Sequence, residues 1–190
     1  TKNAFIPSNI NYDYTISQQI YTVDDLQGKN GKILSYSFQN AKNLTNGDNI
    51  RKFKVYMKNT AKTSFSGNSD WVSMQESDLV FDGNVSYTKV GEWVTINFDT
   101  PFEYESGKNI ILCVYDNTNS WYQSTTNYYG KTTTDKRSIY NYRDDLSYNV
   151  SSVGVTGTLT PFVGNAKFVF EAVGTGGGGG QDPEDPEIPE

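Results

Sequence analysis

Hydrophobic and polar residues alternate most clearly in residues 93–98, where Val94, Ile96 and Phe98 fall on one face. This pattern predicts a β-strand with one buried face. Residues 110–115 are apolar at every position, which is typical of a strand covered on both faces in the middle of a sheet. Between them we expect Pro101 and the Ser106-Gly107 turn to end the first strand and lead the chain across an edge into the second.

Alternation of the same kind predicts five further strands, together with an edge strand that follows a short turn at residues 76–78. The five strands lie in residues 12–20, 34–38, 51–57, 138–143 and 166–170. The odd positions of the first strand are polar, and in residues 51–57 we expect Tyr56 and the neighbouring lysines to face solvent. Residues 22–28 have the pattern of a single capped helical turn.

The composition supports an all-β fold. Aromatic residues make up 14% of the 190 residues, and no segment has a long helical period. A chain of this length suffices for one domain with a proper core. We therefore predict a single antiparallel, jelly-roll-like β-sandwich with long polar loops.

The C-terminal segment differs from the rest of the chain. Residues 174–190 contain a run of five glycines and then prolines at every third position between acidic residues, with no Lys or Arg. Glycine runs do not offset their ordering entropy, and like charges keep a proline-rich segment extended. We expect residues 1–173 to form the domain, and residues 174–190 to be a disordered linker to a further module. Most of the net charge of -6 belongs to this linker.

The residue types exclude much of hydrolase chemistry. The chain has no histidine, and Cys113 is its only cysteine, so His-dependent nucleophiles and thiolate clusters are absent. We expect Cys113 to be a buried core residue. Two carboxylate pairs remain, Glu103 with Glu105 and Asp144 with Asp145, and we expect both to be solvated rather than catalytic. The sequence therefore predicts a protein that is not an enzyme.

Charge and hydropathy also limit the partners. The body of the chain is nearly neutral, and its basic residues are scattered, so no positive stripe for nucleic acid is expected. No apolar run approaches 18 residues, so no membrane insertion is expected.

The most unusual loop predicted from the sequence spans residues 117–134, which are almost entirely Asn, Thr, Ser, Tyr and Gly. It holds Trp121, Tyr122, Tyr128 and Tyr129. Flat aromatic faces in a polar loop suit stacking on sugar rings. The alternative is that the four rings fold back as a lid on the edge of the sandwich.

Polar side chains precede these rings. Asp116, Asn117 and Asn119 could bind sugar hydroxyls, and their oxygens could also act as Ca²⁺ ligands, as could those of Asp24 and Asp25. The spaced acids and glycine of a dedicated calcium loop are missing, so an Asx turn is favoured and no cofactor is expected.

Several sequence segments together resemble one known module. They are residues 14–25, 31–38, 62–65 with 69–71, and 80–117. The combination resembles β-sandwich modules of large secreted and cell-surface multidomain proteins of Bacteroidetes-type bacteria, often beside fibronectin type III-like repeats. The resemblance covers about residues 12–172 and implies a secreted or cell-surface location, with further domains in the same polypeptide. It carries no catalytic residues.

Two functions from different classes follow. The first is a non-catalytic binding or adhesion module that recognises a glycan or a cell surface through the aromatic loop. The alternative is a structural spacer domain with no ligand of its own. The exposure of the four rings distinguishes the two, because a buried ring cannot stack on a ligand.

Overall fold

The computed structural model describes residues 1–43, 50–87, 89–122 and 127–172. Every strand pairing among these residues is antiparallel, which confirms the predicted all-β class. The only helical element among the described residues is one 3₁₀ turn, η1, at Glu76–Asp78. The predicted linker, residues 174–190, lies outside the described residues.

The strands form one large and two small sheets. The six-stranded sheet has the order β10 (Thr158–Thr160), β9 (Ser138–Arg143), β2 (Tyr14–Tyr21), β7 (Asn109–Asp116), β4 (Ile50–Thr60) and β5 (Leu79–Ser86). One small sheet has the order β12 (Ala166–Phe170), β3 (Gly31–Gln39) and β6 (Trp93–Tyr104). The other has the order β1 (Lys2–Asn3), β8 (Tyr128–Thr132) and β11 (Phe162–Gly164).

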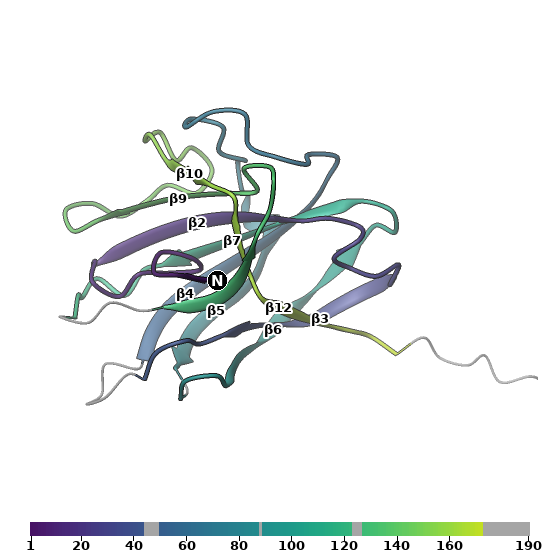
Figure 1. Ribbon diagram of the computed structural model, residues 1–190, viewed down its shortest axis with the longest axis horizontal. Coiled ribbons are helices and arrows are strands. Elements are labelled where there is room, and N and C mark those ends of the chain that lie inside the picture. Colours follow the sequence, from purple (N-terminus) through teal and green to yellow (C-terminus); the bar gives the residue numbers. More distant parts are fainter. Residues whose placement is uncertain (44–49, 88, 123–126, 173–190) are drawn as a thin grey trace, which may run out of the picture.

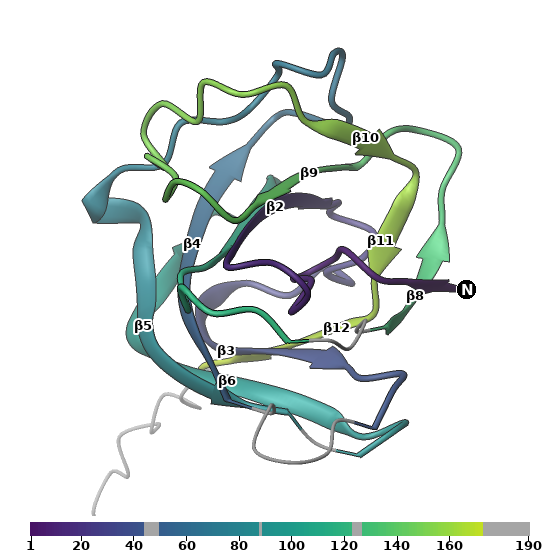
Figure 2. The ribbon, with the colours of Figure 1, turned by 90° about the vertical axis from the view of Figure 1, so that its left-hand side faces the viewer.

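The six-stranded sheet and the β12-β3-β6 sheet lie on opposite sides of the molecule (Figure 1). The main apolar core fills the space between them and includes residues of both, such as Phe53 and Phe38. In Figure 2, β8 and β11 run along one side, between the two sheets. On the other side the large sheet bends, so that its strands β4 and β5 approach β6. The result is a β-sandwich that is partly closed at its sides.

Strand β7 is the centre of the large sheet, as the sequence predicts. It pairs with β2 on one side and with β4 on the other, and seven of its eight residues are buried. Its two faces contribute to two different apolar clusters, with Leu112 in the main core and Ile111 in the second cluster. Cys113 is completely buried, and this burial raises the pKa of its thiol to about 12.

The second apolar cluster lies on the outer face of the large sheet. The apolar residues of β7 predict that this face is covered, but the sequence does not show which segments cover it. Tyr56, which was expected to face solvent, is only 3% exposed and belongs to this cluster. The covering residues come from two long connections and include Phe65, Met74, Tyr148 and Val153. Polar connections can cover a sheet in this way because a few apolar side chains in them supply the contact area.

The amide of Gln18 fixes one of these connections. Its Nε2 donates to the Val72 carbonyl at 2.7 Å, and its Oε1 accepts from the Val72 amide at 2.8 Å. Gln18 is completely buried on β2, so the paired amide satisfies both of its polar ends. This contact joins residues 54 positions apart in the chain.

The odd positions of β2 are polar, as expected, but they are buried rather than solvated. The N-terminal segment packs on them: Ser17 donates to the Pro7 carbonyl at 2.8 Å, and Thr15 donates to the Asn9 carbonyl at 3.1 Å. Hydrogen bonding removes the penalty for burying these hydroxyls.

Two other boundaries differ from the prediction. Strand β6 does not end at Pro101 but continues to Tyr104, with an irregular register opposite Ile33 and Ser35. Pairing with β3 stops between Asn97 and Phe102, so the missing amide of Pro101 breaks no bond to β3. Strand β8 lies within the segment expected to be a polar loop.

Candidate ligand-binding sites

Asp116 and Arg51 form a completely buried ion pair at the end of β7. The Arg51 Nε donates to the Asp116 Oδ2 at 2.8 Å, and both side chains have no exposed area. The two terminal nitrogens of Arg51 donate to the carbonyls of Ser120 at 2.7 Å and Tyr12 at 2.9 Å. One buried guanidinium therefore joins β4, the end of β7, the following loop and the N-terminal segment.

The carboxylate of Asp116 is fully occupied by partners within the protein. Its Oδ2 also accepts from Ser8, and its Oδ1 accepts from the amide and hydroxyl of Thr118 in the expected Asx turn. A buried side chain with these partners has no surface to offer a sugar. Among the described residues, no three His, Cys, Asp or Glu side chains gather as metal ligands would.

Asn117 and Asn119 fix the loop that follows. The backbone N–H of Asn117 donates to the Lys52 carbonyl at 2.8 Å, so the loop begins beside β4. Asn119 adopts a left-handed backbone conformation, with φ of 56°, which asparagine tolerates better than most residues. Its backbone N–H donates to the Asp13 carbonyl at 3.1 Å, and its side-chain Oδ1 accepts from the Tyr14 hydroxyl at 2.7 Å.

Trp121 is the most exposed aromatic side chain of the predicted site, with 54% of its surface accessible. It lies between two fixed backbone positions, because Ser120 accepts from Arg51 and the Tyr122 amide donates to the Ile10 carbonyl at 2.9 Å. The Tyr122 ring is half-buried, 5.7 Å from the Arg51 guanidinium, and packs against the main core.

Tyr128 and Tyr129 lie in β8 and not in a loop. Tyr128 is completely buried, and its hydroxyl forms a 2.7 Å hydrogen bond with that of Tyr87. Tyr129 is partly exposed, with the Lys2 ammonium 5.1 Å from its ring centre. The structure therefore separates the four rings, and the predicted single platform is reduced to the neighbourhood of Trp121.

A stack of four aromatic rings, which the sequence did not indicate, lies on the N-terminal segment and β9. Phe5 stacks on Tyr140 at 4.8 Å and on Tyr142 at 5.3 Å, and Tyr12 lies 4.0 Å from Tyr142 between ring centres. Tyr142 is 37% exposed. Because Arg51 binds the carbonyls of both Tyr12 and Ser120, the backbone that carries this stack lies beside the Trp121 loop. We call Tyr12, Asn119, Trp121 and Tyr142 the Trp121 surface.

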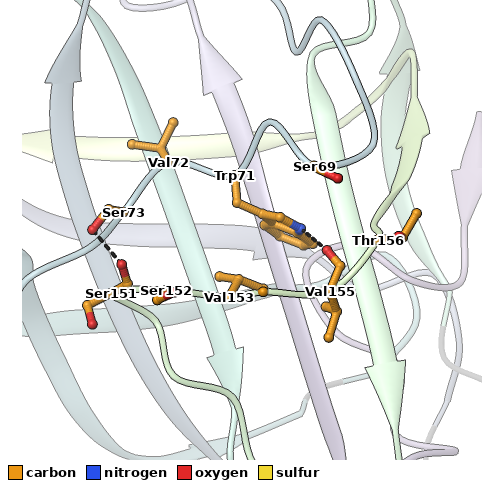
Figure 3. Close-up of a pocket in the computed structure, with 10 residues that line it drawn as sticks. Ser69, Trp71, Val72, Ser73, Ser151, Ser152, Val153, Val155 and Thr156 are labelled. Atoms are coloured by element: carbon orange, nitrogen blue, oxygen red, sulfur yellow. Dashed lines mark hydrogen bonds between the residues drawn. The ribbon is translucent and has the colours of Figure 1, made fainter.

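A separate groove lies outside the large sheet, between the two connections that cover the second apolar cluster (Figure 3). Its volume is about 340 Å³, and it is lined by Ser69, Trp71, Val72, Ser73 and residues 151–156. We call it the Trp71 groove. The indole Nε1 of Trp71 donates to the Val155 carbonyl at 2.8 Å, and the Ser73 hydroxyl donates to the Ser151 carbonyl at 2.8 Å.

A larger cavity, of about 520 Å³, lies beside β12 and includes Trp93, Phe168 and Asp25 in its lining. Asp25 forms ion pairs with Lys131 and Arg137. Burial alone would raise the pKa of Asp25, but hydrogen bonds from Lys131, Thr22 and Arg137 outweigh it and lower that pKa to about 2. A carboxylate held in this way stabilises the fold and is a poor proton acceptor.

The two carboxylate pairs considered for catalysis are on the surface. Glu103 and Glu105 are exposed, and Glu103 forms a 3.1 Å ion pair with Lys32. Asp144 and Asp145 are also exposed, and Asp144 accepts from the Asp13 amide at 2.9 Å.

Comparison with known proteins identifies no family: no family model, no curated protein and no solved structure matches this chain. None of the helical segments in the described part of the chain is long and apolar enough to cross a membrane.

Proposed function

We propose that this protein is a non-catalytic binding module of a larger exported protein, and that it recognises carbohydrate on a glycan or a cell surface through the Trp121 surface. The observation that carries this proposal is the exposure of Trp121 on a backbone fixed from both sides. Trp combines a large rigid apolar face with a polar N–H group, and it is enriched at binding interfaces for this reason.

The fixed backbone supports binding because it reduces the entropy that the loop loses when a ligand binds. Three contacts hold the loop: Arg51 to Ser120, Asn119 to Asp13, and Tyr122 to Ile10. An indole ring stacked on a sugar contributes about 1 kcal/mol beyond the area it buries, by analogy with aromatic pairs.

Polar groups beside Trp121 suit sugar hydroxyls. The Oδ1 of Asn119 accepts from Tyr14, and its Nδ2 has no partner among the described residues, so it can donate to a hydroxyl oxygen. The Tyr142 ring, on which Phe5 and Tyr12 pack, is 37% exposed and adds a second aromatic group to this surface. A site with two rings and amide donors is typical of shallow carbohydrate recognition and provides no acid-base pair.

A glycan array probed with the full chain tests the proposal. We expect hits with wild-type protein, and their loss with Trp121→Ala. Val169→Ala is the matched control. Val169 is also an exposed apolar residue, 51% accessible, but it lies on β12 in the β12-β3-β6 sheet, outside the Trp121 surface. A blank array, or hits that Trp121→Ala leaves unchanged, would favour a spacer domain or another site.

A further inference from the structure

The Trp71 groove exists because two extended segments are joined at their ends and separate between them. At one end the Met74 amide donates to the Val150 carbonyl at 3.0 Å, and at the other the Gly157 amide donates to the Asn68 carbonyl at 2.6 Å. Within the described chain, no backbone hydrogen bond joins residues 69–73 to residues 151–156. Backbone hydrogen bonds therefore fix both ends of the space between the two segments.

The indole of Trp71 forms a rigid wall of this groove. Its Nε1 is bonded to the Val155 carbonyl, and a Cβ atom on Gly157 would lie 2.8 Å from the indole Cζ2, so only glycine allows the ring this position. The ring is half-buried, with its inner part packed against the second apolar cluster. Figure 3 shows Trp71 between Ser69 on one side and Val153 and Val155 on the other.

Hydroxyl groups and the absence of charge define what the groove can bind. The side chains of Ser69, Ser152 and Thr156 make no hydrogen bond to any other described residue. The lining contains no Asp, Glu, Lys or Arg. A ligand with a phosphate, sulfate or carboxylate would lose its hydration there without an opposite charge in return.

We infer that the Trp71 groove is a second binding site, one that takes a neutral sugar. An aromatic wall matches the apolar face of a pyranose ring, and unpaired hydroxyls match its equatorial hydroxyls. The volume of about 340 Å³ lies at the lower end of the range for ligand sites, so one or two sugar units fit. The inference does not depend on the Trp121 surface, since the two sites share no residue.

An extended peptide, the other ligand of a groove between strands, is disfavoured by the backbone. Strand addition needs free amide and carbonyl groups along the edge of the groove. Both groups of Val72 are already occupied by Gln18. On the opposite wall, Gly154 has a φ of 64°, which interrupts an extended edge.

The three tryptophans allow a test that separates the two sites. Each gives one indole N–H signal in a ¹⁵N–¹H spectrum of the full chain, and Trp71→Phe, Trp93→Phe and Trp121→Phe assign the signals. The probes are neutral hexasaccharides of glucose, xylose and mannose, titrated to about 10 mM, the weak-binding range of single sugar sites. We expect the Trp71 signal to shift saturably with at least one of them while the Trp93 signal stays unchanged.

A second variant tests the groove without removing its aromatic wall. Ser152 is exposed, and its side chain makes no hydrogen bond to described residues, so Ser152→Leu should leave the fold intact and fill the groove. We expect at least a tenfold weaker dissociation constant from the Trp71 signal. Ser86→Leu is the matched control, because Ser86 is exposed at the end of β5, outside this groove.

The outcomes distinguish the groove from the proposed function. A saturable Trp71 shift that Ser152→Leu weakens and Ser86→Leu does not supports the groove, whatever the Trp121 signal does. A shift of the Trp121 signal alone supports the Trp121 surface and overturns the groove. The groove is also overturned if no hexasaccharide moves the Trp71 signal, if Ser152→Leu leaves the shift unchanged, or if only an unrelated extended peptide moves it.

Discussion

Trp121 and Tyr128 stand seven residues apart in one polar, aromatic segment, and the fold places them in opposite environments. The Trp121 ring is 54% exposed, whereas Tyr128 has no accessible surface. The difference comes from strand pairing. Tyr128 is the first residue of β8 and pairs with Asn3, and it also forms a bridge with Asn40. Composition therefore marks the segment, but the pairing decides which ring can meet a ligand.

The two rings also differ in what fixes them. Tyr128 is held by a hydrogen bond to Tyr87 and by the edge of the Phe38 ring, 5.6 Å away between ring centres. Among the described residues, the contacts that hold Trp121 are made by the backbone around it, by way of Arg51 and the neighbouring loop. Substitutions should therefore separate stability from binding.

The largest effect is expected from Arg51→Met, which removes the charge that fixes the Trp121 loop. Asp116 would remain buried without its partner, and breaking a buried pair in this way costs about 3 to 5 kcal/mol. Urea unfolding should show a lower midpoint with the same slope. Lys54→Met, which breaks the 3.2 Å pair with Asp82 at the surface, is the control and should cost about 0.5 kcal/mol or less. Equal losses in the two variants would contradict the assigned role of Arg51.

Tyr128→Phe should have a smaller effect that isolates one hydroxyl. The ring stays in the core, but the buried hydroxyl of Tyr87 loses its partner, which costs about 1 to 2 kcal/mol. Tyr129→Phe is the matched control in the same strand, because no hydrogen bond of the Tyr129 hydroxyl is present among the described residues. Thermal unfolding of both variants measures the difference. A neutral Tyr128→Phe would mean that the Tyr87 hydroxyl is satisfied in another way.

Acid should destabilise the protein at β8, the strand of Tyr128, because Lys131 of this strand forms an ion pair with Asp25. The pKa of Asp25 is about 2 in the folded state and 3.8 ordinarily, so the unfolded state binds more protons between these values. Stability from this group is present above about pH 4 and is lost as the pH falls toward 2, a loss of about 1 to 2 kcal/mol. Asp25→Asn should lower stability at pH 7. The urea midpoint of this variant should also fall less between pH 5 and pH 2 than that of the wild type. If the urea midpoint of Asp25→Asn falls between pH 5 and pH 2 as steeply as that of the wild type, other groups cause the loss of stability in acid.

Local patterns were sufficient to predict most strands of the main core, with β8 and β11 as exceptions. Both faces of β7 are apolar in the sequence, and the structure covers both faces. The alternation of β12, with Ala166, Phe168 and Phe170 on one face, also matches its burial. In these strands the periodicity records directly which side meets the core.

The connections that cover the second cluster, and strand β8, could not be predicted in this way. The burial of Tyr56 depends on connections fixed by contacts such as that of Gln18 with Val72, and no local period encodes a contact over 54 positions. Strand β8 has five residues, of which only Tyr128 is buried, so it gives no readable alternation. The one hint is Gly130, where a Cβ atom would lie 2.3 Å from the Val163 carbonyl oxygen of β11.

The candidate site was predictable in its exposed part only. The sequence predicts Trp121 and Asn119 as a ring and an amide in a polar loop, and both are exposed. Asp116 is predicted by the same reasoning, but its partner Arg51 lies 65 positions away in β4, on the same face of that strand as the core residues Phe53 and Val55. Sequence position could not show that this carboxylate is already bound.

The smallest effect on stability should come from Trp121→Ala, which is also the variant expected to change binding most. More than half of the ring is in solvent and its position is set by the backbone, so the free energy of unfolding should change by about 0.5 kcal/mol or less. Binding to the glycans that the wild-type chain recognises should fall at least tenfold, equivalent to about 1.4 kcal/mol. Urea unfolding and the glycan titration on the same preparations test both statements together. If Trp121→Ala destabilises the protein as much as Tyr128→Ala, the ring is part of the fold, and the contrast between the two aromatic residues is lost.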